Sequence, residues 1–545
     1  MEHDVVGARG SSIRFGEQAP CMPGSATDAD TRIIGGAAGA PDARSTRRAL
    51  RYLVAISIVT FALYSATRLL ERAMFYGRAV VHTLQVDGYG AHRTLVVLQM
   101  AGYLVVTVLI FWAYLSVLKM CKGGELDGRR ERYLALGVPV VLNIFCLLWL
   151  PRLSQDAFSY VAHGLLGLLP DHNPLLKPVE STLHTAFAPS FTDFGWLSPG
   201  ITPYGILWTR VEIAVVRFWD GNVYAAVLSF KVIATMASLA TARLIWLMLG
   251  RTYPDLQLQG TLAYLWNPLI VMELAGEGHN DAVMIFFSMA AIAAAIGLRP
   301  ALSLVAQSLG IMTKYLPLAF VPAQLCYLWR VRRNGAHLAR QLAVAGAVSL
   351  AIAILLYAPL WAGTRSFDGI MGRSALTTGS ATLAGATRWF LKQSPLKASA
   401  VPITTALFAL AMSAWILWSA VRVKDARDLL RSCAWISLAF VLIASPDYWP
   451  WYACMPVAWI IVGDFSRLSW LALLMSLLAR LVAPLELLRV HEYMPHVVSR
   501  GLMTGLGTLV PLFSLVVWFY LARRSTPPAE MAAVLGARGS LPEPR

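Results

Sequence analysis

Long apolar stretches separated by short polar loops recur along most of this 545-residue chain. Stretches of about 18 or more apolar residues can cross a hydrocarbon core of about 30 Å as helices. The short alternating segments typical of a membrane β-barrel are not found in the sequence. The pattern therefore predicts an all-α, polytopic membrane protein with about 13 or 14 transmembrane helices.

The composition supports this fold class. Hydrophobic residues make up 57% of the chain and charged residues only 14%, which excludes a set of soluble domains. The formal net charge is +16, but Lys and Arg lie mainly in short loops and in the tails. That distribution sets membrane topology, with contact to anionic lipid headgroups as a lesser consequence. We expect the lipid bilayer as a partner and no nucleic acid. The six cysteines form no CxxC pair, so no disulfide framework or cysteine metal site is indicated.

The polar segments at the two ends divide the chain into three regions. Residues 1–46 are polar and rich in Gly, Ala, Asp and Arg, which predicts a disordered tail. Residues 523–545 predict a second tail of the same kind. Between them, residues 47–522 form the expected transmembrane domain, with a main external loop at 151–204 and a second at 363–398.

Charge sets the orientation of the loops. Arginines precede the first expected span, and the segment 119–132 after the second span is strongly basic, so both lie on the cytoplasmic side. The third span, 133–150, then leads outside, which places the loop 151–204 on the extracytoplasmic face. Both tails are then cytoplasmic, provided that 206–219 is a re-entrant or interfacial helix. Four later basic segments agree: 329–340, 421–431, 464–467 and the Arg pair at 523.

The loop after the third span carries the first candidate for chemistry. Asp156 follows the span closely, where partial desolvation makes a carboxylate a useful general base. If this segment is helical, Asp156, Tyr160 and His163 share one face. A helix N-cap or a solvated loop acid is the alternative for Asp156.

The same loop contains candidate metal ligands. Asp171, His172 and Asp193 offer oxygen and nitrogen atoms to a divalent cation such as Mg²⁺ or Mn²⁺. Their spacing matches no standard metal motif. Ordinary turn residues are therefore the alternative.

A second polar cluster interrupts the apolar pattern at 273–281. Charges at such depth usually face a cavity or a partner. A helical turn with a single N-cap is the alternative, but an N-cap would account for only one of the five polar residues. The cluster consists of Glu273, Glu277, His279, Asn280 and Asp281.

Two further segments add a cation and aromatic rings. Lys314 lies between two short apolar segments, where an ammonium suits a phosphate headgroup. Snorkelling without a specific partner is the alternative. Trp451 and Tyr452 lie in an aromatic stretch at 445–452. An interfacial aromatic belt explains them, and a sugar ring or an isoprenoid chain could also stack there.

Together these motifs resemble the GT-C glycosyltransferases that use polyprenyl-phosphate sugars. They are most similar to the actinobacterial polyprenol-phosphomannose-dependent α-1,6-mannosyltransferases of cell-envelope lipomannan synthesis. The resembling motifs are DAFSYVAHG at 156–164, NP at 173–174, PYG at 203–205, WNP at 266–268, GHND at 278–281, Lys314 and PWY at 450–452. The family often has a second acid beside the first, but this chain has Gln155 there, which puts a paired-acid or metal-chelating first motif in doubt.

The resemblance implies a GT-C-like fold in a bacterial inner (plasma) membrane, with the active site outside. It implies transfer of a sugar, with mannose expected, from a polyprenyl-phosphate donor to a glycan or glycolipid acceptor. Asp156 would be the catalytic base of an inverting reaction. The implied donor- and substrate-binding residues are Tyr160, His163, Asn173, Tyr204, Glu277, His279, Asn280, Asp281, Lys314, Trp451 and Tyr452.

Two other functions remain open on the sequence. A transporter or flippase of a lipid-linked sugar would share the hydrophobicity, but it would place ionisable residues near the bilayer midplane and show repeated halves. Neither feature is found in the sequence. An O-antigen polymerase or ligase would differ in using an oligosaccharide on a diphosphate.

Overall fold

The regular structure of this protein is helical. A computed structural model describes residues 43–84, 89–179, 200–332, 335–369, 382–445, 447–485 and 496–525. Within these ranges there is no β-strand, which confirms the all-α, polytopic fold class. Most of the two expected tails, and part of each external loop, lie outside these ranges.

Seven helical stretches in the described residues are long and apolar enough to cross a bilayer. An eighth would be a broken span, Pro268–Gly276 followed by Asp281–Ile296 with a bend of 115°. The seven stretches lie in α1 (Ala43–Leu84), α2 (Tyr89–Lys122), α7 (Val223–Thr252), α13 (Gly335–Tyr357), α16 (Ala400–Val421), α19 (Phe465–Val482), and α21 (His496–Thr504) with α22 (Val510–Ser525).

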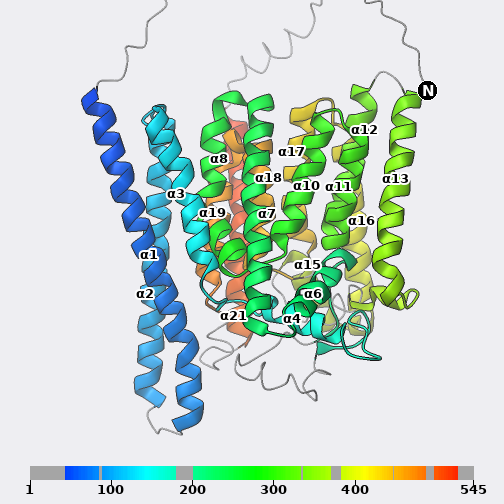
Figure 1. The fold of residues 1–545 in the computed structure, drawn as a ribbon, viewed down its shortest axis with the longest axis horizontal. Coiled ribbons are helices and arrows are strands. Elements are labelled where there is room, and N and C mark those ends of the chain that lie inside the picture. Colours follow the sequence, from blue (N-terminus) through cyan, green and yellow to red (C-terminus); the bar gives the residue numbers. More distant parts are fainter. Residues whose placement is uncertain are drawn as a thin grey trace, which may run out of the picture.

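Shorter helices stand in the same layer as the long ones (Figure 1). They are α3 (Arg129–Leu147), α8 (Gln257–Leu265), α10 (Asp281–Ile296), α11 (Pro300–Thr313), α12 (Val321–Val331), α17 (Ala426–Ala439) and α18 (Cys454–Gly463). Seven or eight full-length spans are fewer than the expected 13 or 14, because several apolar segments form these shorter helices instead. Such helices pack among neighbours, for example α10 against α7 and α11, so they need not cross the bilayer alone.

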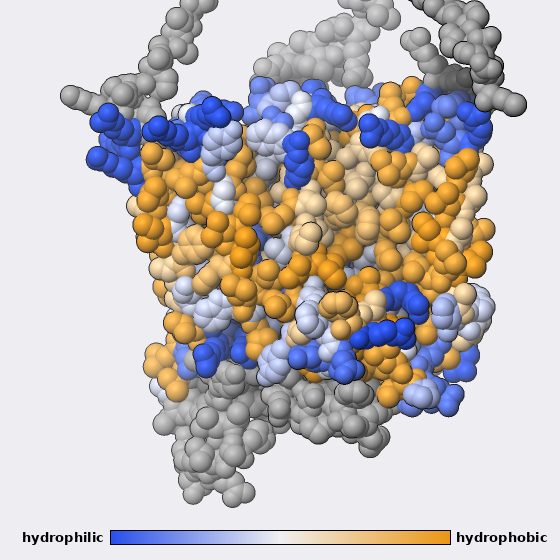
Figure 2. All heavy atoms as spheres, viewed as in Figure 1, coloured by the Kyte–Doolittle hydropathy of each residue, from blue (hydrophilic) through white to orange (hydrophobic). Residues whose placement is uncertain are grey.

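The outer surface is apolar in a broad belt. Only 6% of the apolar stretch of α13 and 11% of that of α16 is buried in the protein. Leu355 and Leu410 on these helices are 73% and 71% exposed. Figure 2 shows this hydrophobic belt between two hydrophilic edges. A patch of this size suits a bilayer and not water.

The two edges differ in the loops that form them. At one edge, the Arg330 guanidinium donates to the carbonyls of Val421 and Val423, at 2.7 and 2.8 Å. Arg427 donates to the carbonyl of Thr252 at 2.9 Å. These bonds hold basic loops from distant parts of the chain together.

The opposite edge carries three short helices. These are α4 (Asp156–Leu166), α6 (Ile206–Phe218) and α15 (Leu383–Lys392) (Figure 1). The segment 206–219, expected as an interfacial or re-entrant helix, forms α6. It packs against α4 and is not among the helices that could cross a bilayer. The predicted site residues gather at this edge.

Candidate active site

The turn that joins η3 (Val271–Gly276) to α10 is the centre of the candidate site. Gly278 lies in this turn with a φ of +79°, a left-handed conformation that favours glycine. A Cβ at this position would lie 2.7 Å from Cγ of Lys231. Glycine therefore permits the sharp reversal that brings Glu277 and His279 beside the start of α4.

Asp156 is the first residue of α4 and contacts this turn. Its Oδ2 lies 3.3 Å from Nδ1 of His279. The Asp156 side chain is 11% exposed, whereas the His279 side chain is fully buried. A carboxylate in the first turn also gains stability as an anion from the helix dipole. Asp156 is therefore the more exposed member of this pair.

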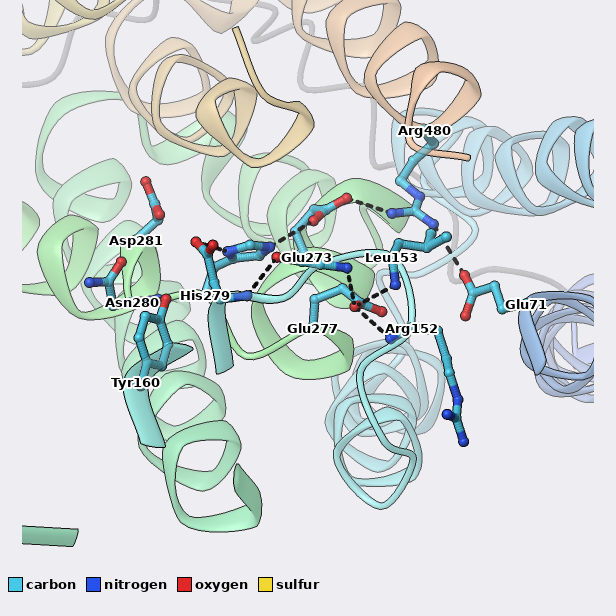
Figure 3. Close-up of polar contacts among 12 residues, drawn as sticks. Glu71, Arg152, Leu153, Tyr160, Glu273, Glu277, His279, Asn280, Asp281 and Arg480 are labelled. Atoms are coloured by element: carbon cyan, nitrogen blue, oxygen red, sulfur yellow. Dashed lines mark hydrogen bonds and ion pairs between the residues drawn. The ribbon is translucent and has the colours of Figure 1, made fainter. Parts of the chain in front are cut away.

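His279 lies between two carboxylates. Its Nε2 is 3.3 Å from Oε2 of Glu273 (Figure 3), whereas Nδ1, the other ring nitrogen, faces Asp156. An imidazole donates from both nitrogens only when it is protonated. Two facing carboxylates therefore favour the imidazolium form and fix the plane of the ring. Through that ring, Glu273 can orient Asp156.

A buried ion-pair network extends from Glu273 to two arginines. Arg480 of α19 lies 2.5 Å from Oε1 of Glu273, and 3.5 Å from Glu71 of α1. Glu71 in turn lies 2.5 Å from Arg68. These four side chains are at most 2% exposed. Buried charges are tolerated only when they are paired, so each member of this network depends on the others.

Glu277 connects this network to the loop that precedes Asp156. Its Oε1 accepts a hydrogen bond from Arg68 at 2.9 Å. Its Oε2 accepts from the backbone N–H groups of Arg152, Leu153 and Ser154, at 2.9, 3.0 and 3.1 Å (Figure 3). Both oxygens are therefore engaged by the protein, and the carboxylate fixes the path of the chain into α4.

Lys314 reaches the same turn from the end of α11. Its Nζ lies 2.8 Å from Oδ2 of Asp281 and 5.2 Å from the centre of the Tyr452 ring. The Lys314 side chain is 18% exposed. Asp281 is two residues from His279, so the structure brings Lys314 and Asp156 to one turn. The ammonium is both paired and accessible.

Stacked aromatic rings cover His279. The Trp451 ring lies 4.0 Å from the His279 ring, with an angle of 20° between the planes. Trp449 in turn stacks on Trp451, with 5.2 Å between the ring centres. The predicted aromatic stretch therefore contacts the predicted polar turn directly. A cationic imidazole gains from such a neighbour.

Tyr160 and Asn280 connect α4 to the turn. The Tyr160 hydroxyl accepts a hydrogen bond from the Asn280 backbone N–H at 3.2 Å (Figure 3). The ring of Tyr160 makes an edge contact with that of Tyr204 at 5.2 Å. The side-chain amide of Asn280 is buried without a hydrogen-bond partner in the described structure, so it retains its capacity to bind a polar group.

His163 lies about two helical turns beyond Asp156 in α4 and contacts α6. Its Nδ1 lies 3.7 Å from Oε1 of Glu212. Burial raises the pKa of the Glu212 carboxyl well above its usual range, and the negative charge of Asp156 raises it further. His163 thus shares the face of α4 predicted for it, without contacting His279.

Comparison with known proteins identifies the family. Residues 53–331 match the family described as alpha-(1->6)-mannopyranosyltransferase, N-terminal domain, which is just over half of the chain. The chain belongs to this family. It is also 26% identical over 404 residues to alpha-(1->6)-mannopyranosyltransferase A of Mycobacterium tuberculosis (strain ATCC 25618 / H37Rv), a match that covers 65% of this chain and 71% of that protein. The resemblance seen in the sequence is confirmed, and the protein is a membrane mannosyltransferase.

Asn173 has a local structural role in this mannosyltransferase. Its side-chain amide donates to the carbonyl of Leu360 at 2.8 Å, and its Oδ1 accepts from the Leu175 backbone N–H at 2.9 Å. These bonds shape the loop after α4 and tie it to the end of α13. The predicted role in substrate binding stays a prediction.

The proposed metal ligands do not form a cluster in the described residues. His172 has its Nδ1 2.7 Å from the carbonyl of Pro170, and Asp171 adopts a φ of +60° typical of a turn. Asp193 lies outside the described ranges. Within those ranges, no group of three or more His, Cys, Asp or Glu side chains is arranged to hold a metal ion.

The sequence analysis placed Glu273 in a candidate polar cluster, but it gave no site role to Arg68, Glu71 or Arg480. The available signal was a charged residue inside an apolar stretch, as in RLLERA at 68–73 and LLARLV at 477–482. Charges in such stretches require partners. The sequence does not say which partners they find.

Proposed function

We propose that this mannosyltransferase moves mannose from a polyprenyl-phosphate donor to a hydroxyl group of an extracytoplasmic glycan or glycolipid. The observation that carries the proposal is the meeting of an accessible carboxylate and an accessible ammonium at one turn. Asp156 contacts His279, and Lys314 contacts Asp281 two residues later. A base for the acceptor and a cation for a phosphate leaving group are what this transfer needs.

Asp156 acts as the general base. It takes the proton of the acceptor hydroxyl while the hydroxyl oxygen attacks the anomeric carbon of the donor. The new carbon–oxygen bond forms as the bond from that carbon to the donor phosphate breaks, and the electron pair leaves with the phosphate. The transition state has oxocarbenium character and the configuration inverts. One base suffices because phosphate leaves as an anion.

Lys314 stabilises the charge that develops on the leaving phosphate. Its pairing with Asp281 at 2.8 Å keeps the ammonium charged and in place, and its 18% exposure leaves it open to a ligand. A preorganised cation at a site of developing charge lowers the barrier. Roles in binding the donor or the acceptor stay predictions for Tyr160, His163, Asn173, Tyr204, Glu277, His279, Asn280, Asp281, Trp451 and Tyr452.

The site faces the extracytoplasmic side of a bacterial plasma membrane in this proposal, and both termini are cytoplasmic. The support is the distribution of basic residues, because cytoplasmic loops are enriched in Lys and Arg. The hydrogen bonds of Arg330 and Arg427 to other basic loops agree with a shared cytoplasmic edge. Asp156 and Lys314 lie at the edge that carries α4 and α6.

The test is mannose transfer by the purified protein. The wild type, Asp156→Asn, Lys314→Gln and the control Asp255→Asn are incubated with polyprenyl-phosphate mannose and a panel of glycan and glycolipid acceptors. Asp255 is an exposed acid in the turn that follows α7. We expect transfer by the wild type and the control, a fall of about 10²-fold or more for Asp156→Asn, and a smaller fall for Lys314→Gln.

Three results would count against the proposal. Full transfer by Asp156→Asn would remove Asp156 as the base. Transfer only from diphosphate-linked oligosaccharides would indicate a polymerase or ligase. Movement of the lipid-linked sugar across liposome membranes, without transfer to any acceptor, would indicate a flippase.

A further inference from the structure

The outer face of α6 forms one wall of a groove that the proposed reaction does not use. The groove has a volume of about 580 Å³ and lies between α6, Gly167 at the end of α4, and Leu360 of η5 (Ala358–Leu360), the short helix that follows α13. Arg210 and Arg217 both line it. They are seven residues apart, so they share one face of the helix. The groove is therefore a concave surface with two guanidinium groups along one side.

Among the described residues, no acidic side chain pairs with the two guanidinium groups of the groove. Neither the Arg210 side chain nor the Arg217 side chain makes a hydrogen bond or an ion pair with any residue that the structure describes. Glu212, the acid of α6, is fully buried and faces His163. Asp220 lies beyond the helix end, in the turn to α7. Two unpaired guanidinium groups favour an anionic ligand.

The position of the groove points to a lipid. Figure 2 shows hydrophilic side chains over α6 at the border of the hydrophobic belt. Phe218, which also lines the groove, is 77% exposed, and the adjacent Trp219 is 41% exposed. Aromatic rings beside arginines are typical of the depth at which lipid headgroups lie. A ligand here would place a charged group on the arginines and an apolar chain beside Phe218.

We propose that the groove between α6, α4 and η5 binds the phosphate headgroup of an anionic membrane phospholipid. Guanidinium groups match phosphate oxygens with paired, parallel hydrogen bonds. Two of them on one helix face can hold one headgroup from two sides. The exposed apolar surface of α13 next to the groove accommodates the acyl chains.

The ligand is distinct from the sugar donor. The anomeric carbon of the donor is bonded directly to its phosphate, so that phosphate must lie beside Asp156 and Lys314. The groove instead reaches Gly167, which is about 16 Å from Asp156 along α4 at the rise of an α-helix. A phosphate in the groove therefore belongs to a second lipid.

The test measures lipid binding to the full-length protein in neutral detergent. Phosphatidylglycerol and phosphatidylcholine are titrated in parallel, and bound lipid is counted by native mass spectrometry. The variants are the single changes Arg210→Gln and Arg217→Gln, their double variant, and a control double variant, Arg129→Gln with Arg130→Gln. The control arginines are exposed and lie at the start of α3, so they measure the effect of net charge alone.

We expect the wild type and the control to bind phosphatidylglycerol more tightly than phosphatidylcholine. Each single change should weaken phosphatidylglycerol binding by about tenfold, and the double change should abolish the preference. Excess inorganic phosphate should compete weakly, because it lacks the apolar chain. The melting temperature in neutral lipid should not change, because neither guanidinium group has a partner within the described structure.

Two outcomes would overturn the proposal. An equal loss of binding in the control pair would mean that the arginines only add net charge at the membrane surface. Unchanged phosphatidylglycerol binding in the α6 double variant would mean that these arginines extend to the interface without a specific ligand.

Discussion

Replacing Glu277 by glutamine should loosen the loop that carries the proposed base. The carboxylate accepts one hydrogen bond from Arg68 and three from the backbone N–H groups of residues 152–154. Glutamine has the same shape but only one acceptor oxygen. In either orientation, its NH₂ group faces donors. If the oxygen keeps the three backbone bonds, Arg68 loses its acceptor on this residue.

The magnitude follows from these contacts. A hydrogen bond to a charged group contributes about 1.5–3 kcal/mol, and breaking a buried ion pair from one side costs about 3–5 kcal/mol. Arg68 keeps its second partner, Glu71, at 2.5 Å, which places the cost near the lower end. We expect Glu277→Gln to lower the free energy of unfolding by about 3 kcal/mol.

Activity should fall as well, because the loop enters α4 at Asp156. A small displacement of a catalytic group costs roughly 10–100-fold in rate. We expect kcat for mannose transfer to fall by that factor, with a smaller change in KM for the donor. Unfolding is measured by denaturant titration in mixed micelles, and transfer by initial rates. The matched control is Glu125→Gln, an exposed residue in the loop before α3.

A Glu277→Gln variant that unfolds at the same denaturant concentration as the control and keeps the wild-type kcat would contradict both expectations. Loss of stability with full kcat in the folded fraction would show that the hydrogen bonds of Glu277 stabilise the fold without positioning Asp156.

Three further substitutions test neighbouring contacts. Glu273→Gln leaves His279 one flanking carboxylate, so we expect kcat to fall about tenfold with little change in donor KM; initial rates measure it, and an unchanged kcat would contradict the orienting role. Gly278→Ala forces a φ of +79° on alanine and puts a Cβ against Lys231; the strain should cost about 2 kcal/mol of unfolding free energy, and a wild-type unfolding curve would exclude it. Trp451→Phe keeps an aromatic ring over His279, whereas Trp451→Ala leaves a cavity worth about 3–5 kcal/mol; equal stability of the two variants would argue against the stack.

The residues of the candidate site could be named from the sequence because their motifs are local, and their roles stay predictions. The polar turn 277–281 interrupts an apolar stretch, and Lys314 stands alone between two others. Burying a charged group within a membrane is costly, so these residues are expected to pair with another group or to face a cavity. The expectation that the segment with Asp156, Tyr160 and His163 is helical was confirmed, since all three lie in α4, and their spacing places them on one face. The count of spans was less accurate, because hydropathy does not distinguish a full span from two short packed helices.

What the sequence alone determined is the all-α membrane fold, the division of its loops between two edges, and the family to which it belongs. These depend on apolar content and on short motifs, which are properties of neighbouring residues. Only the tertiary structure decided how the charges are paired. Arg480 meets Glu273 across 207 positions of the chain, and Arg68 meets Glu277 across 209. Ion pairs form only where packing brings the groups within a few ångströms, and no local pattern records that distance.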